Sequence, residues 1–210
     1  MHDDLFSRPE TGIAAKAPSR AHETMIMMLL AVCMVATRFK HFGDALHVPD
    51  ASMAVFFLGG LYLRRHVGFA AFMLLAVGID RFAVSHAGVS DFCVTPAYVM
   101  LLPAYAVLWY ATRWCGRHRS LWATLVFGLF ASALAFALSN GGFYWFGGRY
   151  AQPNMGQYLS RLWQWGPLFV RTTMIYLVAA LWLQRFVGWL SSIIHRGAPI
   201  AAPAVPHENA

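Results

Sequence analysis

The stretch DRFAVSHAGVSDFCVTPAY, residues 80–98, gathers two aspartates, an arginine, a histidine and a cysteine between two apolar runs. Its cysteine, Cys93, comes just before Pro96, and proline in a first turn is a common helix start. A thiol at the positive end of a helix dipole ionises more readily, and the thiolate is the form that binds metals and attacks electrophiles. Cys93 is therefore a candidate metal ligand or nucleophile; the alternative is a small buried side chain without chemistry.

The other two cysteines and the histidines form no second site. Cys33 lies within the first apolar run and Cys115 just past the fourth, so neither is placed to pair with Cys93. The histidines show none of the spacings typical of zinc sites. We therefore predict no dedicated metal bound by the protein alone.

Two ionisable residues adjoin or interrupt apolar runs. Asp80 ends the third run, and Arg171 lies inside the sixth. Ionisable side chains at membrane depth are costly and usually mark function. The two can pair with each other, with Arg81 competing for the aspartate, or each can face a polar cavity and contact a substrate.

A third candidate is SNGGFYWFGGRY, residues 139–150, in which four glycines permit tight turns and aromatic side chains offer flat apolar surface. One interpretation is a lid that folds over a large, flat ligand and brings Tyr144 against it. The other is an aromatic belt at the membrane interface.

The elements that must position these residues are transmembrane helices. The chain of 210 residues is 59% hydrophobic and only 12% charged, with a mean hydropathy of +0.51, whereas soluble domains carry about 25% charged residues. This composition predicts an all-α integral membrane protein, a six-helix bundle in the lipid bilayer. The six apolar stretches are Met25–Thr37, Ala51–Leu63, Val67–Ile79, Val94–Tyr110, Leu121–Leu138 and Gly166–Leu183.

A crossing takes roughly 20 residues, so the first three stretches are short, and the alternative is that some are buried or re-entrant pieces. We expect one transmembrane domain over residues 25–190, between a polar tail over 1–24 and an Ala/Pro-rich, disordered tail over 191–210. Gly59–Gly60 and the pair Ala131/Ala135 have the small side chains that let helices pack closely.

The basic residues predict the orientation. With the amino terminus inside, ten arginines and lysines fall on the inner side and five on the outer: Arg38, Lys40, Arg81, Arg149 and Arg161. Because inner loops carry the excess of positive charge, both termini are predicted to be cytoplasmic. The longer loops, over 38–50, 80–93 and 140–161, then form an outer working face. The net charge of +7 reflects topology, and no nucleic-acid partner is predicted.

This pattern resembles the substrate-binding S components of energy-coupling-factor vitamin transporters. More specifically, VPDASMAVFFLGGLYLRR, GIDRF, DFCVTPAY and SNGGFYWFGGRY look like the BtuM family of bacterial vitamin B12 transporters, over roughly residues 25–190. The resemblance implies a multi-pass protein of the bacterial inner membrane that takes up cobalamin. The cysteine of DFCVTPAY is its most specific element.

In that family the loop cysteine reaches the cobalt of cobalamin, which implies this role for Cys93 and makes Asp80 and Tyr98 pocket residues. We add Phe92, Tyr144 and Arg171 to the predicted substrate-binding residues. The family is also associated with removal of the cyanide ligand of cyanocobalamin. A soft thiolate is a good donor to cobalt and would weaken the bond on the opposite face.

S components that dock on a shared energising module often carry Ala-x3-Ala in the first span. Here Ala31 and Ala36 are five apart, so no dedicated module is predicted. Two other functions stay open. One is a transporter of the same fold for another vitamin or precursor, with Cys93 incidental; the other is a small membrane enzyme or thiol redox protein with Cys93 as nucleophile. ATP hydrolysis is excluded because no phosphate-binding glycine loop occurs.

Overall fold

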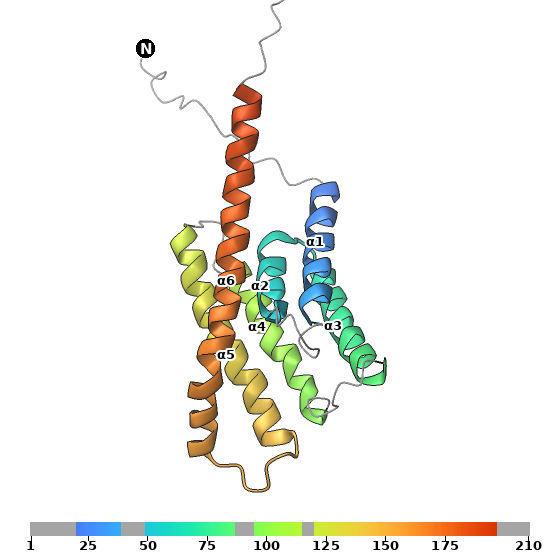
Figure 1. Cartoon of the computed structure of the whole chain (residues 1–210), viewed down its shortest axis with the longest axis vertical. Coiled ribbons are helices and arrows are strands. Elements are labelled where there is room, and N and C mark those ends of the chain that lie inside the picture. The colour runs from blue at the N-terminus through green and yellow to red at the C-terminus, as the bar shows by residue number, and fades with distance from the viewer. Residues whose placement is uncertain (1–19, 39–48, 87–94, 115–119, 197–210) are drawn as a thin grey trace, which may run out of the picture.

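The computed structural model describes residues 20–38, 49–86, 95–114 and 120–196, and within these ranges it contains helices and no strands. In chain order the elements are α1 (Arg20–Arg38), α2 (Ser52–Tyr62), α3 (Val67–His86), the short 3-10 helix η3 (Pro96–Met100), α4 (Leu101–Trp114), α5 (Leu121–Phe146) and α6 (Met155–Arg196) (Figure 1).

Four of the described helices are long and apolar enough to cross a membrane, namely α1, α3, α5 and α6. The prediction of an all-helical, multi-pass membrane protein is therefore confirmed at this level. The other two are shorter: α2 has 11 residues and α4 has 14. At 1.5 Å per residue α2 is only about 17 Å long, against a hydrocarbon core of about 30 Å. Six full crossings stay a prediction.

Several predicted boundaries were wrong, because hydropathy finds the apolar middle of a helix and misses its amphipathic ends. Helix α1 begins at Arg20, inside the segment predicted as a polar tail. Helix α6 has 42 residues, and its carboxyl-terminal end runs past α5 and α1 (Figure 1). It therefore covers part of the predicted loop over 140–161 and the first residues of the predicted tail over 191–210.

The glycine-aromatic segment is mostly helix rather than a flexible loop. Helix α5 continues to Phe146, and a Cβ at Gly142 would lie only 2.4 Å from Cβ of Met100 on η3. This glycine thus permits close packing of α5 against η3. The turn comes at Gly148, whose φ of +68° lies in the left-handed region that favours glycine. Residues 139–146 therefore form a packed helix and not an open lid.

Helix α2 lies at the centre of the bundle, as expected for a helix that is apolar on every side. Eight of its residues are buried, and the Phe56 ring stacks on Tyr105 of α4 with centroids 4.1 Å apart. The approach of α2 to α4 requires glycine, because a Cβ at Gly60 would lie 2.2 Å from the backbone oxygen of Trp109. The predicted packing role of Gly59–Gly60 is confirmed.

We predict that Gly60→Ala destabilises the protein by about 1–3 kcal/mol, the usual effect of overpacking a core, because the added methyl group forces α2 away from α4. The matched control is Gly78→Ala in α3, where an added Cβ meets no atom within 4 Å. The control should be neutral or stabilising by up to about 1 kcal/mol. Equal unfolding free energies for the two variants in detergent micelles would contradict this account of the packing.

Candidate functional site

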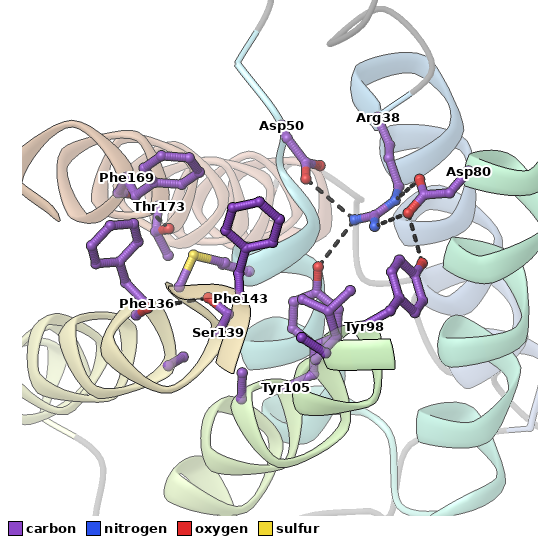
Figure 2. Close-up of a pocket in the computed structure, with 15 residues that line it drawn as sticks. Arg38, Asp50, Asp80, Tyr98, Tyr105, Phe136, Ser139, Phe143, Phe169 and Thr173 are labelled. Carbon is purple, nitrogen blue, oxygen red and sulfur yellow. Dashed lines mark hydrogen bonds and ion pairs between the residues drawn. The ribbon is translucent and has the colours of Figure 1, made fainter. Parts of the chain in front are cut away.

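A cavity of about 220 Å³ lies at the end of the bundle where α1 and α3 end and η3 begins; we call this the cavity end (Figure 2). One wall is polar and comes from α1 to α4, and the other is apolar and comes from α5 and α6. The lining residues that the argument uses are Arg38, Asp80, Tyr98, Phe136, Phe143 and Phe169.

The polar wall is organised around the guanidinium of Arg38, the last residue of α1. It binds Asp80 of α3 with two parallel hydrogen bonds, from Nε to Oδ1 and from Nη2 to Oδ2, each 2.6 Å long. Its Nη1 donates to Ser52 Oγ at 2.9 Å and to the Tyr105 hydroxyl at 3.0 Å, and it lies 3.3 Å from Asp50 Oδ2. One side chain therefore connects α1, α2, α3 and α4.

Because both partners are buried, the stability of the fold requires that this ion pair stay intact. Arg38 and Asp80 are each only 6% exposed, and removing either partner of a buried pair leaves an uncompensated charge. The bidentate geometry is the strongest form of the arginine–carboxylate contact. With Asp50, the cluster contains one positive and two negative side chains.

Tyr98 extends the polar wall toward the start of η3. Its hydroxyl donates to Asp80 Oδ2 at 2.6 Å, so the Asp80 carboxylate accepts three hydrogen bonds from Arg38 and Tyr98 together (Figure 2). A carboxylate held this way is fixed in position. It can orient a ligand but has little freedom to follow one.

Asp50 fixes the entrance to α2. Its Oδ1 accepts hydrogen bonds from the Ser52 backbone nitrogen at 2.9 Å and from Ser52 Oγ at 2.6 Å. Its side chain is 22% exposed, against 9% for Asp80. Of the two aspartates that line the cavity, Asp50 is thus the more accessible to a ligand.

The facing wall is aromatic. Phe136 of α5 stacks on Phe169 of α6 with ring centroids 5.0 Å apart, and Phe143 lines the same side. The two hydroxyl groups of this wall, on Ser139 and Thr173, donate to backbone oxygens of their own helices. The cavity therefore combines flat apolar surface with a few fixed polar groups, as ligand sites commonly do.

A second, smaller cavity of about 140 Å³ adjoins the first and is lined by Val77, Asp80, Arg81, Thr95 and Tyr98. The Thr95 hydroxyl is buried, and within the described residues it has no hydrogen-bond partner. Thr95 is two residues along the chain from Cys93. The chain just after the cysteine thus lies beside Asp80 and Tyr98.

The structure brings together only some of the predicted site residues. Asp80 and Tyr98 meet in one hydrogen bond and line both cavities. Cys93 and Phe92 lie outside the described residues. Tyr144 is buried away from the main cavity, and its hydroxyl accepts from the Asn154 nitrogen at 2.9 Å, which ties α5 to the start of α6.

The partner of Asp80 was left open by the sequence, and the structure supplies one that was not considered, while Asp80 also faces the cavity. Its partner is Arg38, 42 residues away in sequence, rather than Arg171 or Arg81. Arg171 is exposed, because at 100° per residue it lies on the opposite face of α6 from Phe169 and Thr173, which line the cavity.

Three members of the polar wall were missed by sequence reasoning: Arg38, Asp50 and Tyr105. The signal for Arg38 was its position at the end of an apolar run, where the cost of a buried charge already indicates a partner. It was counted instead among the outer loop charges.

No group of three or more His, Cys, Asp or Glu side chains in the described ranges is arranged to hold a metal ion. Neither a protein-family model nor a curated protein sequence matches this chain.

We predict that Arg38→Met lowers the free energy of unfolding by about 3–5 kcal/mol, as expected when one partner of a buried ion pair is removed. The control is Arg64→Met, which removes an exposed arginine 3.6 Å from Glu23 and should change stability by about 0–1 kcal/mol. Denaturation in mixed micelles measures both. Similar losses in the two variants would mean that Arg38 does not hold the four helices together.

Proposed function

We propose that this protein takes up a corrinoid, cobalamin or a close relative, across the bacterial inner membrane, and binds it at the cavity end. The observation that most supports the proposal is the Tyr98–Asp80 hydrogen bond on the wall of an aromatic-lined cavity. Both residues belong to the motifs GIDRF and DFCVTPAY that carry the resemblance to B12 transporters.

The proposed topology is six crossings with both termini in the cytoplasm. Arg64, Arg65, Arg113 and Arg185 lie near the end of the bundle opposite the cavity, where α2, α4 and the later part of α6 meet. By the positive-inside rule that end faces the cytoplasm, so the cavity opens outward. An outward-facing site is what an uptake protein needs, and no dedicated energising module is proposed as its partner.

Cys93 is the proposed ligand to the cobalt of the bound corrinoid. Its thiolate displaces the axial ligand on its own face of the cobalt and donates an electron pair in that ligand's place, and in cyanocobalamin the cyanide on the other face leaves as the anion with the cobalt–carbon electron pair. The cobalt oxidation state is unchanged, so this exchange needs no reductant. Asp80 and Tyr98 line the same small cavity as Thr95, which is two residues after Cys93 in sequence, and they orient the ligand.

A volume of about 220 Å³ is below the range of about 300–1,000 Å³ typical of small-molecule sites. We therefore assign the macrocycle to the mouth of the cavity, with only a side group inside. The same observation favours the second candidate, a transporter of a smaller vitamin or precursor in which Cys93 is incidental.

The visible absorption spectrum tests the proposal and separates the two candidates. Purified protein incubated with cyanocobalamin should retain the corrinoid and show a shifted spectrum, because sulfur replaces another ligand on cobalt. Cys93→Ser should lose this shift. Cys33→Ser, which alters a free, half-buried cysteine of α1, should keep it.

A spectral shift that survives in Cys93→Ser would remove the thiolate from the mechanism. Colourless wild-type protein that retains a smaller vitamin would support the second candidate instead. A thiol-dependent activity without a bound ligand would point to a membrane enzyme.

Tyr98→Phe tests the polar wall separately from the cysteine. We predict about ten-fold weaker corrinoid retention, the scale of a hydrogen bond to a charged group, because Asp80 Oδ2 loses one of its two donors. Tyr110→Phe is the control, since Tyr110 is 45% exposed and lines neither cavity. Equal equilibrium binding in the two variants would show that the ligand does not depend on this wall.

A further inference from the structure

A separate cavity of about 390 Å³ lies at the opposite end of the bundle, between the end of α2, the start of α5 and the later part of α6. Its apolar side comes from Leu61, Leu121 and Leu181, and its polar side from Tyr62, Thr124, Gln184 and Arg185. None of these residues lines the cavity described above. We call it the lower-leaflet groove, because it lies at the end of the bundle that carries Arg113 and Arg185.

Arg185 is the charged group of the lower-leaflet groove. It is exposed, and within the described part of the chain it makes no ion pair. Its neighbour Gln184 accepts a hydrogen bond from the Tyr62 hydroxyl through Oε1, which leaves the amide nitrogen of Gln184 as a further donor. An available guanidinium beside an amide donor is a suitable site for a phosphate oxygen.

Gly188 keeps the groove open. Glycine destabilises the interior of a helix, yet close packing does not require it here, because an added Cβ would meet no atom within 4 Å. Since Gly188 lines the groove, any larger side chain would project into space that is now empty.

The helices that line the groove also carry exposed tryptophans, which are typical of a membrane interface. Trp122 and Trp182, each next to a lining leucine in sequence, are 76% and 67% exposed. Tryptophan is enriched at the level of lipid headgroups. A ligand with an anionic head and an apolar tail would meet Arg185 with its head and the three leucines with its tail.

We propose that the lower-leaflet groove binds one anionic phospholipid, with its phosphate on Arg185 and Gln184 and an acyl chain along Leu61, Leu121 and Leu181. Free phosphate offers the same anionic oxygens as the phospholipid, but the apolar side of the groove favours the lipid. This site is independent of corrinoid binding and does not rest on the proposed function.

Native mass spectrometry of the full chain in detergent tests the site. The probes are phosphatidylglycerol, phosphatidylcholine and sodium phosphate, each added separately. We expect one retained phosphatidylglycerol per chain, and about ten-fold weaker retention in Arg185→Gln. Gly188→Leu should also lose the lipid, because the side chain fills the groove, while Gly78→Leu, at an equally open glycine of α3, should retain it.

Undiminished phosphatidylglycerol binding in Gly188→Leu would overturn the proposal, and so would equal retention of phosphatidylcholine by the wild-type chain. Competition by millimolar sodium phosphate with no preference for lipid would assign the site to the free anion. Arg185→Lys keeps the charge and should restore part of the binding. Thermal unfolding of each variant identifies any loss that comes from misfolding.

Discussion

The arrangement of the first four helices depends on the guanidinium of Arg38. A guanidinium removed from water carries a penalty of several kcal/mol unless acceptors surround it. Here the acceptors come from α3, the entrance and first turn of α2, and α4. These segments must therefore meet at one point, and their meeting forms the polar wall of the cavity. Structure and site are two consequences of the same buried charge.

The two walls of the cavity differ in how they are held. Directional bonds fix Asp80 and Tyr98, whereas the α5–α6 wall relies on aromatic stacking and close helix approach, as at Gly128, where a Cβ would lie 2.7 Å from Leu177. Apolar contacts are non-directional and tolerate small displacements. Among the described residues, separating α5 and α6 from the cavity breaks no ion pair, while moving α1 or α3 breaks the one between Arg38 and Asp80.

Hydropathy predicted the helices well where the chain is apolar on all sides. Helix α2 was placed within one residue at each end, and Pro96 does begin a helical turn. Sequence interpretation failed over residues 139–146. The glycines there suggest a turn, but they are required by packing against Met100 and Tyr158. Such glycines can be interpreted only when the neighbouring helix is known. The pairing of Asp80 was out of reach for the same reason, since Arg81 and Arg171 were equally plausible partners by sequence.

The sequence does show how far each arginine lies within an apolar run, and this position could have been compared between arginines. Arg38 lies at the end of an apolar run and is saturated by acceptors, so it serves mainly to hold the wall. Arg185 also lies in an apolar context, but it is exposed and without an ion pair among the described residues. A membrane-embedded arginine needs an anion from some source. Where the protein supplies the anion the residue is structural, and where it does not, the bilayer is the nearest supply.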